Sequence, residues 1–171
     1  MGDIIAASKL SAGAVYSYFP SKEELILTAV TTSLGGLGER VEPILRQAPP
    51  PPPELLVQEI ALAVSRFTAR EGYDLKRIAL LGWSEAQRNE RLRETMRGFY
   101  IAFRDRLAEV AAQWRAAGRL HGDASPPEVA KTVLAAVLGF VVQSAILGDV
   151  EPRDLARGVR DLARPAPGDA P

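Results

Sequence analysis

Apolar residues recur along most of the chain at spacings of three and four, the period of a helix that buries one face. Sustained alternation of apolar and polar residues, the pattern of a half-buried strand, is scarce. The sequence therefore predicts an all-α fold, with short helices at the front and longer ones behind. The predicted helices span 3–9, 12–18, 21–47, 54–71, 75–89, 90–117, 127–148 and 152–163.

Serine residues mark the beginnings of two of the front helices. Ser11 and Ser21 stand at N-cap positions, where a hydroxyl accepts a hydrogen bond from a free amide of the next turn. Ser21 and Glu24 also have the spacing of a capping box. The front is thus predicted to contain two short helices joined by a tight turn, followed by the capped start of a long helix.

Glycine and proline interrupt the pattern at two places. Gly35, Gly36 and Gly38 fall within the predicted helix 21–47, and each costs up to ~1 kcal/mol relative to alanine. We expect that helix to bend or break there. The unbroken proline run 49–53 is expected to form a stiff, extended connector on the surface, since proline cannot continue a helix.

The front resembles a known DNA-binding signature. Two short helices joined by a tight turn form the unit that places its second helix in the DNA major groove. The stretch 4–25 closely resembles the helix-turn-helix signature of tetracycline-repressor-like (TetR) transcription regulators. The residues that carry the resemblance are Ser11, Gly13, Tyr16, Tyr18, Phe19, Ser21, Lys22, Glu23, Glu24 and Leu25.

This resemblance implies a DNA-binding transcriptional regulator, and specifically a repressor that a small hydrophobic ligand releases from its operator. It also implies which positions face double-stranded DNA. These are Ser11, Ala12, Gly13, Tyr16, Ser17, Tyr18 and Lys22. Reading of the bases would fall on Ala12, Gly13 and Ser17. None of these is the Arg, Asn or Gln expected for bidentate contacts, so we expect modest direct readout.

The motif begins almost at residue 1, whereas the DNA-binding domain of the family has an earlier helix and a basic arm. We therefore expect the chain to lack that first helix. Residues 1–25 contain Lys9 and Lys22 but also three acidic residues, so we expect this front to hold phosphates weakly.

The body of the chain predicts a ligand site. The stretches 81–88 and 133–149 resemble the regulatory domain of one TetR subgroup, which implies a small-molecule effector. Aromatic residues at helical spacing could surround an apolar cavity with few polar anchors. The candidate ligand-binding residues are Phe67, Ile78, Trp83, Gln87, Phe99, Tyr100, Phe103, Phe140 and Gln143. The alternative is that these aromatic residues form plain core. Glu85 and Arg88, three residues apart, are expected to form an ion pair.

The end of the body predicts a homodimer. Helix 127–148 is apolar on nearly every side between Val133 and Val142, so it must be buried all round. In a small chain, such burial calls for a second subunit, and the predicted interface is 127–163. Two-fold symmetry would present two recognition helices to a pseudo-palindromic operator. We expect DNA reading in 1–33, ligand binding and dimerisation in 34–163, and a disordered tail in 164–171.

Composition excludes some classes of protein. The chain has no cysteine, so it has neither disulfides nor thiolate metal sites. Its 171 residues carry 21 basic and 21 acidic side chains, which argues against a protein coated in nucleic acid but not against a local DNA contact. No signal sequence opens the chain, and the apolar run 133–142 is shorter than the ~20 residues of a membrane span. The predicted location is the cytoplasm.

Two alternative functions are an enzyme and a helical ligand-binding or scaffold dimer. An enzyme would need a catalytic group, and the only histidine, His121, lies in a glycine-flanked turn with Asp123, which is typical of a solvated loop. No phosphate-binding loop, metal-ligand cluster or cofactor motif supports catalysis. The other alternative is a helical ligand-binding or scaffold dimer with impaired DNA binding. Operator binding that a small molecule reverses would separate the regulator from the scaffold.

Overall fold

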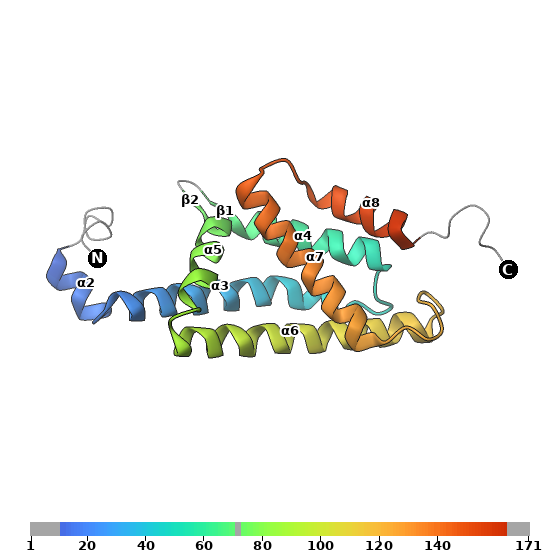
Figure 1. The fold of residues 1–171 in the computed structure, drawn as a ribbon, viewed down its shortest axis with the longest axis horizontal. Helices are drawn as coiled ribbons and strands as arrows, with labels where there is room; N and C mark the ends of the chain where they lie inside the picture. The colour runs from blue at the N-terminus through green and yellow to red at the C-terminus, as the bar shows by residue number, and fades with distance from the viewer. Residues whose placement is uncertain (1–10, 71–72, 164–171) are drawn as a thin grey trace.

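A computed structural model describes residues 11–70 and 73–163 of the chain (Figure 1). Its helices are α2 (Ala12–Tyr18), α3 (Lys22–Leu45), α4 (Pro53–Thr68), α5 (Leu75–Glu85), α6 (Glu90–Ala116), α7 (Pro126–Ile146) and α8 (Pro152–Ala163). The all-α fold predicted from the sequence is confirmed. The predicted helix 3–9 and the predicted disordered tail 164–171 lie outside the described residues.

One small sheet interrupts the helices. Strands β1 (Ala69–Arg70) and β2 (Tyr73–Asp74) pair antiparallel, with Ala69 opposite Asp74 and Arg70 opposite Tyr73. The predicted helix 54–71 is therefore wrong at its end, where α4 stops at Thr68 and this hairpin begins. Two-residue strands are too short to show an alternating pattern, which explains the error.

The predicted N-caps at the front are confirmed. The Ser11 hydroxyl accepts a hydrogen bond from the amide of Ala14 at 3.2 Å, and the Ser21 hydroxyl accepts one from the amide of Glu24 at 3.2 Å. The carboxylate of Glu24 pairs with Arg91 of α6 instead of returning to its own cap. The Ser21 half of the predicted capping box is therefore present, whereas the Glu24 side chain forms an ion pair that links α3 to α6.

Of the bend or break expected in helix α3, the break is wrong, because the helix runs without interruption through all three glycines. The structure gives two of them a packing role. A Cβ at Gly36 would lie 3.2 Å from the ring of Phe67, and a Cβ at Gly38 would lie 3.4 Å from the ring of Phe99. These glycines let aromatic rings of α4 and α6 approach the α3 backbone, and packing of this kind offsets their low helix propensity.

The proline connector is less exposed than expected. Pro50 is buried, so the prediction of a surface connector is wrong at this residue. The carbonyl of Pro50 accepts a hydrogen bond from Arg119 Nη1 at 2.9 Å, and the carbonyl of Pro51 accepts one from Trp114 Nε1 at 2.7 Å. Because proline has no N–H, these acceptors are the backbone groups that burial must satisfy.

The core lies where α4 is enclosed by the other long helices. In Figure 1, α3 and α6 run side by side, α7 crosses them, and α8 packs on α4. The largest fully buried side chains are Trp114, Phe140, Leu56, Ile60, Leu92 and Leu107. A second, smaller cluster near the front joins Val30 of α3 to Ala86, Leu92 and Met96. This cluster connects the front half of α3 to the start of α6.

Helix α7 is only partly covered. Val133, Val137, Phe140 and Val141 are buried, whereas Ala135 is exposed, so a single chain does not bury this helix all round. Among the described residues, α7 alone is long and apolar enough to cross a membrane by length and composition, although its run 133–142 is short for a span. Core helices of soluble proteins can pass the same test.

Candidate functional site

Helix α2 stands at one end of the molecule, beyond the start of α3 (Figure 1). Three residues, Phe19 to Ser21, separate the two helices. The hydroxyl of Ser11 caps α2, and the hydroxyl of Ser17 donates to the carbonyl of Ala14 at 2.7 Å. Since α2 and α3 are nearly continuous in the chain, the orientation of α2 depends on where the body holds α3.

The predicted DNA-facing positions of this end are open to solvent where the structure describes them. Gly13, Ser17 and Lys22 are exposed, and Tyr18 is 78% exposed. Such exposure is unusual for an aromatic side chain with only one polar atom. Ser11 is also exposed. The side chains of Ala12 and Tyr16 lie outside the described part of the structure.

A cavity of about 350 Å³ lies between α3 and α6, with α4 and α7 contributing to its walls. Its size falls at the lower end of the range for small-molecule sites. The lining residues are Leu37, Gly38, Glu39, Val41, Glu42 and Leu45 of α3, Ile60 and Val64 of α4, Phe99, Ala102, Phe103 and Arg106 of α6, and Val137 of α7.

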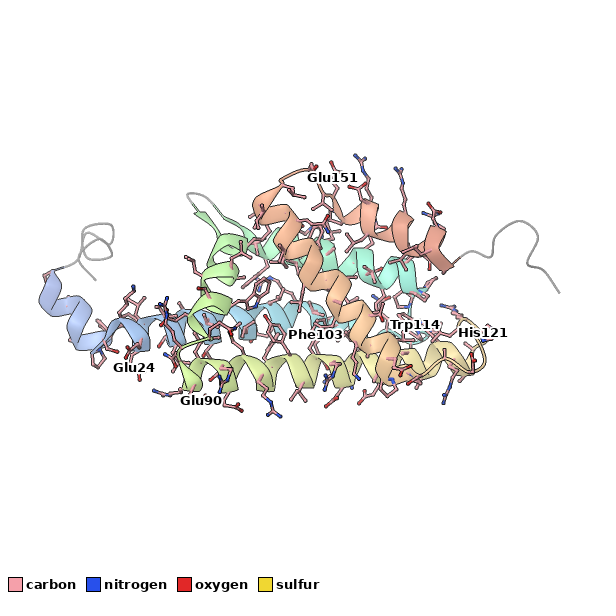
Figure 2. The ribbon with its side chains drawn as sticks, viewed as in Figure 1. Glu24, Glu90, Phe103, Trp114, His121 and Glu151 are labelled. Atoms are coloured by element: carbon pink, nitrogen blue, oxygen red, sulfur yellow. The ribbon has the colours of Figure 1, made fainter. Side chains whose placement is uncertain are left out.

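The cavity contains two of the nine predicted ligand residues. Phe99 and Phe103 line it, and Phe103 lies between α3 and α6 in Figure 2. The predicted set did not include the aliphatic lining residues or the three charged ones, Glu39, Glu42 and Arg106. A signal for part of the lining existed, because Leu37, Val41 and Leu45 follow one another at four-residue spacing along α3.

The other predicted aromatic residues lie elsewhere in the body. Phe140 is fully buried in the main core. Trp83 Nε1 donates to the hydroxyl of Tyr100 at 2.7 Å. Burial raises the pKa of that hydroxyl, and the bond from Trp83 partly opposes the shift. The ring of Phe67 lies under the Arg40 guanidinium, 4.6 Å from the ring centroid. Trp83, Tyr100 and Phe67 therefore make contacts between helices and are not among the lining residues of the cavity.

The predicted polar contacts lie away from the cavity as well. Gln87 and Gln143 are exposed, and Gln87 Nε2 donates to the carbonyl of Trp83 in α5 at 3.4 Å. The side chain of Ile78 lies outside the described part. The predicted ion pair is confirmed, with Arg88 Nε 3.1 Å from Glu85 Oε2.

Two charged residues of the cavity lining, Glu42 and Arg106, pair with each other. Glu42 Oε1 accepts from Arg46 Nε at 2.6 Å and from Arg106 Nη2 at 3.0 Å. The hydrogen bond from Arg46 is the main cause that lowers the pKa of Glu42, burial opposes it, and Arg106 adds to the lowering. Arg106 also pairs with Glu109. Glu42 is therefore an ionised carboxylate at neutral pH, held between two guanidinium groups.

The rival catalytic pair is a surface feature. His121 and Asp123 lie in the turn between α6 and α7 (Figure 2), with His121 Nδ1 2.5 Å from Asp123 Oδ1. Their side chains are 87% and 86% exposed, and the contact with His121 lowers the pKa of Asp123. Within residues 11–70 and 73–163, no three His, Asp or Glu side chains are grouped to hold a metal ion.

Both the front and the body of the chain match known protein families. Residues 1–29 match the family described as bacterial regulatory proteins, tetR family. Residues 58–163, more than half of the chain, match the C-terminal domain of BetI-type transcriptional repressors. A search of curated proteins finds no match. An exposed short helix at the head of α3 and an all-α body agree with both matches, and the chain belongs to the TetR family of DNA-binding transcriptional regulators.

Proposed function

We propose that the protein is a homodimeric, cytoplasmic repressor that releases its operator when a small hydrophobic ligand fills the cavity. The observation that supports the proposal most is that helix α3 both follows the proposed DNA-reading helix α2 and lines the cavity. Helix α3 begins three residues after α2 and contributes six of the cavity-lining residues. At 1.5 Å per residue its 24 residues span roughly 36 Å, which links a site in the body to the DNA-reading end.

The mechanism requires the ligand to distinguish two positions of α3. A ligand shifts an equilibrium only as far as its affinities for the two states differ. The cavity has α3 as one wall and α6 as the other, so filling it changes the spacing or angle between these helices. In a dimer, a change in the angle of α3 alters the distance between the two recognition helices. The operator half-sites, about 34 Å apart, then no longer fit.

We assign DNA reading to residues 1–33 and ligand binding with dimerisation to residues 34–163. The exposed positions Gly13, Ser17, Tyr18 and Lys22 support this assignment of the front. The proposed DNA-facing set also contains Ser11, Ala12 and Tyr16. Hydroxyls and one ammonium group suit phosphate contacts, whereas methyl contacts and DNA shape would supply much of the sequence preference.

We assign dimerisation to residues 127–163. Ile146 and Leu147 at the end of α7 are 66% and 62% exposed, and Leu162 of α8 is 90% exposed. Leu134, Leu138 and Val142 are half-buried in the single chain. Exposed large apolar side chains are typical of surfaces that another protein covers. A second copy would cover this face by two-fold symmetry.

The experiment measures fluorescence anisotropy of labelled operator DNA with increasing protein, with and without a hydrophobic effector found by thermal shift. We expect binding in the absence of effector and release in its presence. Tyr18→Ala should weaken binding about fivefold to tenfold, the effect of one lost contact. Leu81→Ala is the matched control, since Leu81 is 70% exposed on α5. Ligand binding without any DNA binding would favour the scaffold alternative, and a monomer in sedimentation would contradict the dimer.

A further inference from the structure

The walls of the cavity are hydrocarbon over most of their area. Apart from Gly38, the lining side chains are aliphatic or aromatic except for Glu39, Glu42 and Arg106. At 1.5 Å per residue, the wall from Leu37 to Leu45 spans roughly 12 Å, and that from Phe99 to Arg106 roughly 10 Å. Phe99 rests against Gly38 toward one end, and the Glu42–Arg106 pair stands at the other. Along α6 the lining therefore runs from an apolar end at Phe99 to a polar end at Arg106.

The charges at the polar end already satisfy one another. Glu42 accepts from both Arg46 and Arg106, and Arg106 also pairs with Glu109. Glu39 also belongs to the lining, but its residue is exposed to solvent. A charged ligand group placed beside Glu42 and Arg106 would lose its own hydration and find no uncompensated partner there, which is a large cost.

The polar end still has hydrogen-bond donors to spare. A guanidinium group carries five N–H donors. Arg106 makes one bond to Glu42 through Nη2 and one to Glu109 through Nη1. Its remaining N–H groups can donate to a neutral oxygen without breaking either ion pair. A hydroxyl or carbonyl oxygen meets this requirement, whereas an ammonium group is repelled by Arg106 and brings no acceptor.

We propose that the effector of this cavity is an uncharged molecule with an elongated apolar body of about 10–12 Å and a single hydroxyl or carbonyl oxygen at the Arg106 end. The proposal rests on the proposed function, since it names the chemical class of that effector. It also assigns Gly38 as the residue that keeps the apolar end open. A side chain at Gly38 would project toward the Phe99 ring and occupy the space of the ligand.

The test compares three probes with one ten-carbon chain: 1-decanol, decanoate and decyltrimethylammonium. Binding is measured by calorimetry at neutral pH, and operator release by anisotropy. We expect 1-decanol to bind about tenfold or more tightly than either charged probe. A charged probe that binds as tightly as 1-decanol and releases the operator would overturn this inference but leave the proposed function standing. If none of the three binds, this inference fails, whereas the proposed function is decided separately by the anisotropy experiment with an effector found by thermal shift.

Two glycine variants test whether the probe occupies this cavity. Gly38→Leu should abolish 1-decanol binding, whereas Gly35→Leu should leave it unchanged, since a Cβ at Gly35 meets nothing within 4 Å. Circular dichroism checks the fold of both. If Gly38→Leu fails to fold, Gly38→Ala replaces it, because its Cβ would lie at ordinary contact distance from Phe99 and still reduce the volume. Equal affinities of the Gly38 and Gly35 variants would place the probe elsewhere and overturn the proposal.

Discussion

Adjacent glycines in α3 allow the packing of this helix to be tested with a single methyl group. Gly35 and Gly36 are neighbours in the middle of the same helix. A Cβ at Gly35 meets no atom within 4 Å, whereas a Cβ at Gly36 would lie 3.2 Å and 3.3 Å from two carbons of the Phe67 ring. The variants Gly35→Ala and Gly36→Ala therefore share the gain in helix propensity and differ in the contact.

The change in stability has one contribution from helix propensity, which both variants share, and one from the ring contact, which only Gly36→Ala has. Replacing glycine by alanine inside a helix is worth up to about 1 kcal/mol. For a chain of this length, that corresponds to a rise in melting temperature of roughly 2–4 °C for Gly35→Ala. In Gly36→Ala the Phe67 ring must move, but it is buried and lies under Arg40. Overpacking of this kind costs about 1–3 kcal/mol, so the net change is between neutral and a loss of about 2 kcal/mol.

The assay is thermal unfolding followed by circular dichroism at 222 nm, with both variants and the parent chain at equal concentration, because dimerisation would make the midpoint concentration-dependent. We expect the melting temperature of Gly36→Ala to fall below that of Gly35→Ala by about 2–12 °C. If Gly36→Ala is stabilised as much as Gly35→Ala, the ring does not press on the backbone. The packing role given to Gly36 would then be wrong.

Three further substitutions test individual contacts. Trp114→Phe removes the donor to the Pro51 carbonyl and should cost about 1–2 kcal/mol in urea unfolding; no loss would mean that water replaces the bond. Asn89→Ala removes the cap that accepts from the amide of Leu92 and should cost about 1 kcal/mol, measured in the same way, whereas an unchanged midpoint would contradict the cap. Glu42 has a lowered pKa in the folded chain, so its contribution to stability is present above the ordinary value of 4.5 and is lost as the pH falls through the lowered one. The difference in melting temperature between the parent and Glu42→Gln should therefore shrink in acid, and a difference independent of pH would refute the ion-pair assignment.

Local chemistry allowed the helices to be placed from the sequence. Ser11 and Ser21 begin α2 and α3 as expected, because an N-cap depends on a hydroxyl and an amide three residues apart. Helix α8 was predicted with its observed bounds, and α6 within one residue at its end. The all-α class and the family resemblance of the front could likewise be found from short stretches of sequence.

Contacts between distant segments could not be placed in this way. Phe99 was among the predicted ligand residues, but its neighbour Gly38 was expected to weaken a helix. Glu42 and Arg106 are 64 residues apart, and neither has a sequence signal that distinguishes it from other surface charges. Only the packing of α3 beside α6 brings this pair to one end of a cavity.

The sequence by itself thus determined the fold class, most helix boundaries and a candidate DNA-reading end, since each depends on groups within a few residues of one another. The tertiary structure alone decided which aromatic residues are core and which line the cavity. Phe103 and Phe140 both lie inside long helices and were both predicted to bind a ligand, yet the first lines the cavity and the second is fully buried in the core. Which face of a helix is covered depends on where the other helices pack, and that is a property of the whole chain.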